Sequence, residues 1–191
     1  MRIPFRLVIL DLETNGGTVE DTTAHRIIEI GAIKLDEELR VMGEFSMLVD
    51  GRPVLDEVVK IHGITNEDLV GKPLFSQARL DFDEFCGPKQ DYILGAWGAY
   101  FDIPVLRSEY QRAGLKFPHR GESFDVKAVV WWDLLKQNKP ARHLNLEQAA
   151  GLYGLPFYGK KHRAVDDARM TARVLQAVSG KRHPSLGVGQ L

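Results

Sequence analysis

Cysteine, net charge and long hydrophobic runs are all scarce in this sequence. Its 191 residues include one cysteine, Cys86, so a disulfide within the chain is excluded, which fits a reducing compartment. Cys86 is expected to be a buried apolar side chain rather than a reactive thiol. Lys and Arg number 25 against 26 for Asp and Glu, and the net charge of -1 offers polyanions no general attraction. A nucleic-acid partner would have to be bound through a local contact.

No apolar stretch approaches the roughly twenty residues that a membrane-spanning helix needs. The apolar run near the N-terminus is too short for the core of a signal peptide and is broken by Arg6. We therefore expect a cytoplasmic protein without membrane contact. The chain has no internal repeat, and its length suits one domain over residues 1–180 with a short tail over residues 181–191.

Apolar patterns along the chain predict a layered α/β domain. Residues 5–10 are apolar on both faces, as in a central strand with helices on both sides of the sheet. The next two strands are expected to form a hairpin, because only a short charged turn separates them. These two strands are expected over residues 26–35 and 41–49, and later strands over residues 92–96 and 123–124. Helices are expected over residues 53–61, 75–85, 103–113, 126–135, 144–152 and 164–178.

The first candidate site residues, Asp11 and Glu13, follow the apolar residues of the first strand. Residues two apart on a strand share a face, so both carboxylates should project together at the end of the strand. Like charges held this close repel each other unless a cation lies between them. Carboxylate oxygens are preferred ligands of Mg2+ and Mn2+, so the pair predicts a divalent metal site.

Asp102 follows the strand predicted over residues 92–96 and stands at the start of a helix. Ligands collect at such strand-to-helix junctions in α/β sheets. The alternative is that Asp102 only caps a helix whose first turn contains Pro104, and for this residue taken alone the cap is favoured. The position by itself is compatible with both roles.

A third segment holds His162 and Asp167, which are five residues apart. If both were helical, their side chains would point about 140° apart. We therefore place His162 in the loop before the last helix, reaching over the site, and Asp167 on the helix as a metal ligand. Asp166 should point elsewhere and favour the helix dipole. Alanines at every fourth position from Ala164 should let this helix approach the sheet closely.

Together these segments resemble the DEDDh family of 3′ to 5′ exonucleases, which includes RNase T, replicative proofreading subunits, and the ERI-like and KapD-like enzymes. With 26 acids in the chain an isolated Asp-x-Glu pair is common, but the order and contexts of these segments are not. The resemblance covers about residues 5–178. The matching segments are Asp11-Leu12-Glu13-Thr14, Arg26-Ile27-Ile28-Glu29-Ile30-Gly31-Ala32, His62-Gly63-Ile64-Thr65, Phe101-Asp102, and His162 with Asp167.

The resemblance implies an RNase H-like fold, with a mixed central sheet of about five strands, antiparallel first and parallel after, flanked by helices. It also implies two Mg2+ or Mn2+ ions roughly 4 Å apart around the scissile phosphate, held by Asp11, Glu13, Asp102 and Asp167. His162 would accept the proton of the attacking water, a role that imidazole suits because it is mostly neutral at physiological pH. The implied reaction releases 5′-mononucleotides from single-stranded 3′ ends of RNA or DNA.

The second motif departs from the family pattern. Much of the family has His-Asn-x-x-Phe-Asp where this chain has Trp97-Gly98-Ala99-Tyr100-Phe101-Asp102. The missing Asn removes no metal-binding carboxylate, so it leaves the expected activity intact and bears on the subfamily instead. A Trp-Gly pair at this place is similar to the ERI-like and KapD-like branch.

Three further residues are expected to contact substrate. Thr14 follows the first acid pair and could offer its hydroxyl or backbone N–H to the 3′ end. Ile64 resembles a family segment near the terminal nucleotide, although a helix-capping turn is at least as well favoured. Lys161 lies beside His162 and could meet a phosphate, although a charged loop is usually only solvated.

Other conspicuous residues are expected to be structural. The adjacent Trp131 and Trp132 could stack on bases, but at least one of two neighbours on a helix should face the core, so packing is predicted. Glu29 lies inside a predicted strand and is expected to be a hydrogen-bonded acid rather than a metal ligand.

Three functions remain open. The first is a free-standing exonuclease, and the second is a polymerase-associated proofreader, for which residues 180–191 offer little tether. The third is a non-catalytic nucleic-acid-binding or regulatory module on the nuclease fold, against which the presence of all five active residues argues. The choice between RNA and DNA depends on contacts to the 2′-OH, which need leave no trace in a sequence. Protein partners and oligomeric state are equally open.

Overall fold

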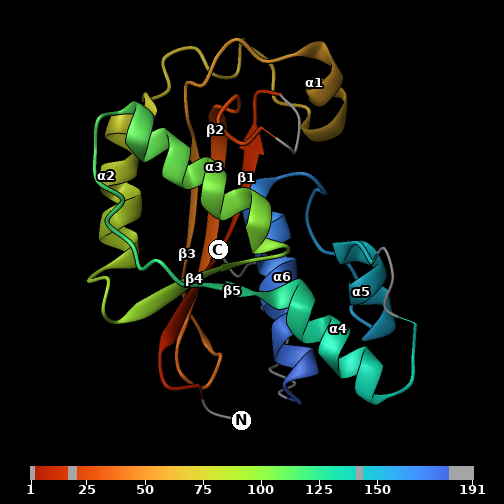
Figure 1. The fold of residues 1–191 in the computed structure, drawn as a ribbon. Helices are drawn as coiled ribbons and strands as arrows, with labels where there is room; N and C mark the ends of the chain where they lie inside the picture. The colour runs from red at the N-terminus through yellow and green to blue at the C-terminus, as the bar shows by residue number, and fades with distance from the viewer. Residues whose placement is uncertain (1–2, 17–20, 141–143, 181–191) are drawn as a thin grey trace, which may run out of the picture.

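A computed structural model describes residues 3–16, 21–140 and 144–180, where helices cover both faces of one five-stranded sheet (Figure 1). The predicted tail over residues 181–191 lies outside the described residues. Within the described ranges no helix has the length and apolar content to cross a membrane. The strands are β1 (Arg6–Thr14), β2 (Ile27–Leu35), β3 (Val41–Leu48), β4 (Tyr92–Ala96) and β5 (Ser123–Asp125). The helices are α1 (Asp56–His62), α2 (Phe75–Cys86), α3 (Ala99–Arg112), α4 (Val126–Lys136), α5 (Leu146–Leu152) and α6 (Ala164–Val178).

The strands lie in the order β3-β2-β1-β4-β5. β1 pairs antiparallel with β2 and β2 with β3, whereas β4 runs parallel to β1 and β5 parallel to β4. A short turn suffices for the antiparallel hairpin, while the parallel strands are reached through helical crossovers. The predicted mixed sheet, antiparallel first and parallel after, is confirmed.

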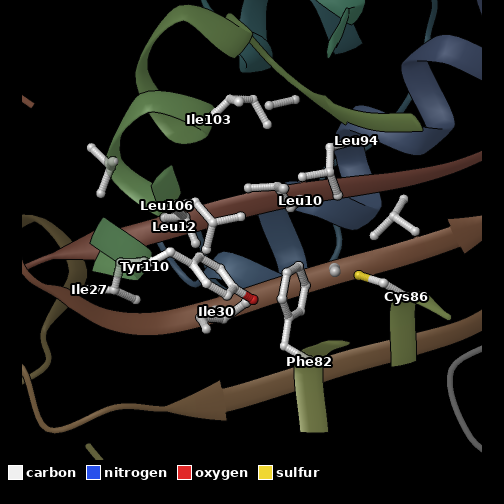
Figure 2. Close-up of a cluster of buried hydrophobic side chains, with 14 of the residues drawn as sticks. Leu10, Leu12, Ile27, Ile30, Phe82, Cys86, Leu94, Ile103, Leu106 and Tyr110 are labelled. Carbon is white, nitrogen blue, oxygen red and sulfur yellow. The ribbon is translucent and has the colours of Figure 1, made fainter. Parts of the chain in front are cut away.

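β1 is the central strand, and its side chains alternate between the two sides of the sheet. Leu10 and Leu12 face the layer of α2 and α3, where Phe82 fills the core (Figure 2). Leu7 and Ile9 face the opposite layer, to which α6 contributes the buried alanines of its first turns. Helices thus cover this strand on both sides, as its two-faced apolar run predicts.

α6 lies close against the sheet. Ala164, Ala168 and Ala172 are 1% exposed or less. The backbone of Ala164 rests on Gly31 of β2, where a β-carbon on the glycine would overlap it. Small residues on both elements therefore bring the first turn of α6 directly onto the strand. The close approach predicted from the alanine spacing is confirmed, and it fixes the position of the residues at the start of this helix.

Most predicted boundaries hold within a few residues, but α3 begins at Ala99, well before the expected start. The prediction placed Pro104 in the first turn, whereas Pro104 lies inside the helix and costs a backbone hydrogen bond there. Gly98 precedes the helix with a φ of 77°, a left-handed conformation that glycine adopts without strain. The chain therefore turns from β4 into α3 with almost no loop, and Asp102 stands in the first turn of the helix.

Trp131 and Trp132 contradict the packing prediction. Both lie on the exposed side of α4, with 41% and 65% of their surface accessible. The helix buries Val126 and Val130, a four-residue repeat that leaves the two positions after Val130 outside the core. Cys86 is buried as expected, at the end of α2 (Figure 2).

Candidate active site

Asp11 and Glu13 lie on the side of β1 that faces α6, in continuation of the buried Ile9. The pairing of β1 with β2 sets Asp11 opposite Gly31 and Glu13 opposite Glu29. Since alternate residues of a strand share a face, the two carboxylates project together beyond the last core residue on that side. The shared face predicted for this pair is therefore observed.

Asp102 reaches the same point from α3. Its side chain is 6% exposed, and one carboxylate oxygen accepts a hydrogen bond of 3.1 Å from the backbone N–H of Leu12, between the two acids of β1. That bond ties the first turn of α3 to the end of β1. The capping alternative is wrong, because the N-cap residue of α3 is Gly98.

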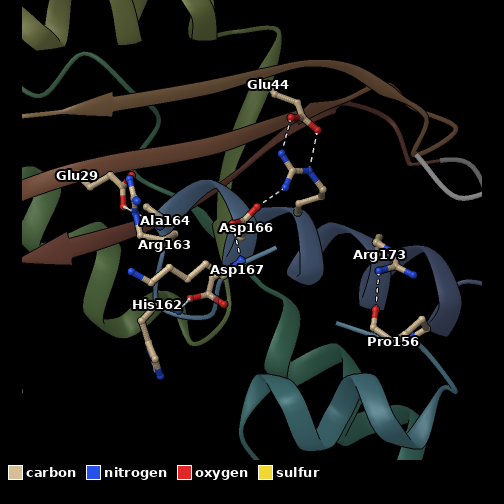
Figure 3. Close-up of polar contacts among 11 residues, drawn as sticks. Glu29, Glu44, Pro156, His162, Arg163, Ala164, Asp166, Asp167 and Arg173 are labelled. Atoms are coloured by element: carbon tan, nitrogen blue, oxygen red, sulfur yellow. Dashed lines mark hydrogen bonds and ion pairs between the residues drawn. The ribbon is translucent and has the colours of Figure 1, made fainter. Parts of the chain in front are cut away.

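Asp167 and His162 come from the start of α6 and the loop before it (Figure 3). The carboxylate of Asp167 accepts a hydrogen bond of 2.9 Å from the backbone N–H of His162. His162 has a φ of 58°, in the left-handed region that residues with a side chain seldom adopt. The loop is thus folded back onto the helix, so His162 stands in the loop and Asp167 on the helix as predicted.

Asp166 ties the same loop to the edge of the sheet. Its carboxylate accepts a hydrogen bond of 2.8 Å from the backbone N–H of Lys160. It also forms an ion pair with Arg169, whose guanidinium binds Glu44 of β3 at 2.7 Å (Figure 3). Asp166 does not line the cavities described below, and it holds the loop in addition to favouring the helix dipole.

Glu29 anchors the start of α6 from β2. Its buried carboxylate accepts hydrogen bonds from the guanidinium of Arg163, at 2.6 and 3.0 Å. It also accepts one of 3.0 Å from the backbone N–H of Ala164. These donors occupy the carboxylate although it stands opposite Glu13, so Glu29 is the hydrogen-bonded structural acid that was predicted.

All five predicted active residues line one cavity of about 300 Å³. A second cavity, of about 220 Å³, adjoins it on the side of α5 and shares several of the same walls. The buried Asp102 lies deepest among the five residues, and His162 is the exposed one. The convergence predicted from separate segments is therefore observed, whereas the catalytic and metal-binding roles stay predictions. The larger cavity is lined by Asp11, Leu12, Glu13, Trp97, Gly98, Tyr100, Phe101, Asp102, His162 and Asp167.

The carboxylates concentrate negative charge where there is little water. Burial, followed by the charges of Asp167 and Glu29, raises the pKa of Glu13 to about 8. Burial also raises the pKa of Asp102 to about 7 and the pKa of Asp167 to about 6. The pKa of Asp11 is raised well above its usual range by burial and then by the charge of Asp102. At neutral pH the cluster therefore favours the uptake of protons or of a cation.

A divalent cation fits these donors. One ligand atom each from Glu13, His162 and Asp167 lie within 4.8 Å of one another, close enough to share an ion. Asp11 and Asp102 border the same cavity. Carboxylate oxygens suit hard cations such as Mg2+ and Mn2+, and a bound cation would offset the burial and the mutual repulsion that raise the pKa values.

The three predicted substrate-contacting residues are placed differently. Thr14 ends β1, and its hydroxyl oxygen lies 3.0 Å from Nδ1 of His25. Ile64 is 3% exposed and packs in a small core cluster beside α1. Lys161 is on the surface, in an ion pair of 2.6 Å with Glu147, and it lines the smaller cavity. Substrate contact by any of the three stays a prediction, and for Ile64 only a small exposed part of the residue is available.

Trp97 and Tyr100 line the larger cavity, although neither was predicted to be a site residue. Trp97 is partly buried after the end of β4 and also borders the smaller cavity. Tyr100 is exposed in the first turn of α3. The sequence held one indication of their role: the second motif, which differs from the common family pattern, places both aromatic residues close to the expected ligand Asp102.

Comparisons of sequence agree with this geometry. Residues 8–175 match the RNase T family, whose description is exonuclease. DNA polymerase III subunit epsilon of Rickettsia prowazekii is 31% identical over 182 residues, which cover 93% of this chain and 75% of the relative. The epsilon subunit of Treponema pallidum is 32% identical over 164 residues, which cover 84% of this chain and 70% of the relative.

Solved structures of low sequence identity share the fold. Cell-death related nuclease 4 has a TM-score of 0.81 at 16% identity, with 93% of this chain and 65% of that chain covered. The nuclease domain of 3′hExo, a DEDDh family member bound to rAMP, has a TM-score of 0.75 at 19% identity, with 92% of each chain covered. Exonuclease I of E. coli, in complex with an oligonucleotide, has a TM-score of 0.75 at 19% identity, but only 41% of that chain is covered. The predicted RNase H-like fold is therefore confirmed.

Proposed function

Because this chain belongs to the RNase T family of exonucleases, we propose that it is a metal-dependent 3′ to 5′ exonuclease acting on single-stranded 3′ ends of RNA or DNA. The products are 5′-mononucleotides. The observation that carries the proposal is the convergence of Asp11, Glu13, Asp102, Asp167 and His162 on one cavity. These side chains come from three separate segments of the chain: β1, the first turn of α3, and the start of α6 with the loop before it.

We assign the four carboxylates to the binding of two Mg2+ or Mn2+ ions. Held there, such ions would supply a lower pKa for the attacking water and stabilisation of the charge that develops on the phosphate and the leaving oxygen. The chain supplies the arrangement of ligands: β1 presents Asp11 and Glu13, α3 presents Asp102 through its bond to Leu12, and α6 presents Asp167.

His162 is the proposed general base. Its side chain is on the exposed side of the cavity, where a water molecule can reach both the ring and the phosphate. As the water oxygen bonds to phosphorus, the ring nitrogen takes the proton and the bond from phosphorus to the preceding nucleotide's 3′ oxygen breaks. The released nucleotide then carries a 5′-phosphate, and the leaving 3′ oxygen takes a proton from solvent, so the shortened strand ends in a 3′-hydroxyl.

Substrate contacts are assigned to Thr14, Ile64 and Lys161. Thr14 ends β1 directly after Asp11 and Glu13, and its backbone N–H or hydroxyl is assigned to the 3′ end on that ground alone. Lys161 borders the smaller cavity, and its side chain and that of Glu147 are both solvent-exposed. The ammonium group of Lys161 can therefore leave Glu147 and pair with a phosphate of the substrate backbone.

A proofreading subunit of a polymerase is the second candidate, favoured by the identity to epsilon subunits. This role uses the same chemistry and adds a polymerase as partner. It predicts faster removal of a mismatched 3′ nucleotide than of a paired one, which a primer-template assay measures. Equal rates on both primers, together with rapid digestion of free strands, favour the free-standing enzyme. A cytoplasmic location is part of both candidates.

The direct test is digestion of end-labelled single-stranded RNA, single-stranded DNA and duplexes with 3′ overhangs, in Mn2+ and in EDTA. We expect stepwise shortening from the 3′ end in Mn2+ and none in EDTA. Asp102→Ala should abolish cleavage but retain some binding, whereas a non-catalytic module would show no metal-dependent cleavage to lose. Cleavage in EDTA, cuts inside the strand, or full activity of His162→Ala would each overturn the mechanism.

A further inference from the structure

Tyr100 has no role in the mechanism assigned above, yet it is one of the residues that line the cavity of the five proposed active residues. It stands in the first turn of α3, two positions before Asp102, and 65% of its surface is exposed. A large aromatic side chain gains little stability from so exposed a position, because the free energy of burial scales with the area removed from water. Its position at a charged cavity therefore asks for a ligand with an apolar surface.

Gly98 determines where the ring of Tyr100 lies. A β-carbon on Gly98 would be 2.9 Å from Cε1 of Tyr100, closer than β-carbons approach other atoms in proteins. The ring therefore covers the glycine backbone and fills the space in which a side chain at position 98 would begin. Gly98 replaces the Asn of the common second motif, and Tyr100 stands at one of its variable positions; together they form one arrangement at the wall of the cavity.

The other aromatic residues of the cavity are partly buried. Phe101 packs edge-on against His25, with 5.0 Å between ring centroids. Trp97 packs against the core clusters beneath α4 and α6. Tyr100 is the most exposed of the three, so its ring is the one most accessible to a bound nucleotide.

We propose that Tyr100 is a stacking platform for a nucleobase near the 3′ end of the bound strand. This inference rests on the proposed exonuclease function, which brings a single strand to this cavity. Aromatic rings stack on every base, so the contact holds strands of any sequence. The chain's net charge of -1 gives little general attraction to phosphates, and stacking therefore supplies a larger share of the affinity than in a basic nuclease.

A thermodynamic cycle between ring and base tests the proposal. Wild type and Tyr100→Ala are compared on an intact strand and on strands with an abasic residue at each of the last three positions, in turn. Losing one stacked base should lower kcat/KM by about 5- to 150-fold for the wild type. For Tyr100→Ala the abasic residue at the stacking position should cost little more, because the ring is already missing. If removing the ring and removing a base lower kcat/KM by independent factors, so that the two factors multiply at all three positions, the proposal is overturned.

Two further variants separate stacking from a structural effect. Tyr100→Phe keeps the ring and should retain the abasic penalty. Trp132→Ala removes an aromatic that is also 65% exposed, on α4 and outside both cavities, so it should leave the penalty unchanged. The exposed Tyr100 contributes little to folding, so the Tm of Tyr100→Ala should match that of the wild type.

The same cycle on dissociation constants separates this inference from the proposed function. Binding is measured by fluorescence anisotropy with Ca2+ in place of Mn2+. A wild type that binds strands but does not cleave them in Mn2+ contradicts the exonuclease proposal, while coupling between ring and base still supports the platform. If the protein cleaves or binds strands but shows no coupling between Tyr100 and a base, only the stacking platform is contradicted. If no binding is detected, the stacking platform is contradicted as well.

Discussion

The two halves of the candidate active site are built differently. Asp11 and Asp102 come from β1 and α3, and a hydrogen bond from the backbone N–H of Leu12 to the Asp102 carboxylate joins these two elements in the interior of the fold. His162 comes from an exposed loop that two hydrogen bonds to carboxylates on α6 hold in place. The proposed metal ligands Asp11 and Asp102 are therefore fixed by secondary structure, and the proposed base His162 by a few polar contacts. Damage to those contacts should impair the base and spare metal binding.

The largest expected effect comes from the deeper half. Asp102→Asn removes a charge but keeps an oxygen that can accept the hydrogen bond from Leu12. We expect kcat to fall at least about 1000-fold, because metal ligation supplies several kcal/mol of transition-state stabilisation. The rise in Tm that Mn2+ gives the wild type, about 5 to 10 °C at a hundred times Kd, should shrink as well. If the variant has an unchanged kcat and an unchanged Tm shift with Mn2+, Asp102 is not a metal ligand.

His162→Ala tests the other half of the comparison. Loss of a general base costs about 100- to 10,000-fold in rate, and hydroxide at higher pH should restore part of it. The Tm shift with Mn2+ should remain, since the carboxylates are intact. If that shift disappears, His162 is a metal ligand, a role that its closeness to Glu13 and Asp167 also permits.

Glu29→Gln should break the support of α6 without touching the cavity. The amide keeps the size of the side chain but loses the charge that binds Arg163. We expect the free energy of unfolding to fall by about 1 to 3 kcal/mol, which lowers Tm by roughly 2 to 12 °C. We also expect kcat to fall by a larger factor than the affinity for Mn2+. Arg40→Ala, which breaks the exposed pair with Asp36, is the control and should change Tm by little.

The stability of the metal-free protein should depend on pH through the carboxylates. The raised pKa values, about 8 for Glu13, 7 for Asp102 and 6 for Asp167, exceed the ordinary carboxyl values near 4 that the unfolded chain has. The folded state therefore binds more protons than the unfolded state between about pH 4 and pH 8, and stability falls as pH rises through this window. Thermal melts in EDTA should show this fall, and saturating Mn2+ should reduce it. A Tm in EDTA that rises from pH 5 to pH 8 would contradict the raised pKa values of these buried carboxylates.

The smallest effect is expected from Lys161→Ala. Lys161 is exposed and already paired with Glu147, so a phosphate contact replaces one weak ion pair by another. We expect KM to rise less than about fivefold and kcat to stay unchanged. Weaker salt dependence of KM in the variant would confirm a phosphate contact, whereas identical salt dependence would show that Lys161 is only solvated.

Much of the fold and the convergence of the five proposed active residues on one cavity could be predicted, because each lies in a local pattern. The alternation of β1 determines that Asp11 and Glu13 share a face. The alanine spacing of α6 predicts its close approach to β2, and the spacing of His162 and Asp167 separates loop from helix. Motif segments that resemble a known family then connect these distant places in one site.

The missed features depend on contacts that no local pattern records. Pro104 suggested a later start for α3, but Gly98 allows the chain to turn directly from β4 into the helix. Which side of α4 is buried depends on the elements beside it, so the exposure of Trp132 could not be deduced from its neighbours in sequence. Likewise, Arg163 meets Glu29 across 134 positions of the chain.

Isotope transfer tests the central claim most directly. A single strand is digested with the wild-type protein in Mn2+ and water enriched in 18O, and the products are identified by mass spectrometry. Water activated beside His162 should place one 18O in the 5′-phosphate of each released mononucleotide, and Asp102→Asn should release none. Label in a 3′-phosphate, unlabelled mononucleotides, or release in EDTA would contradict the account.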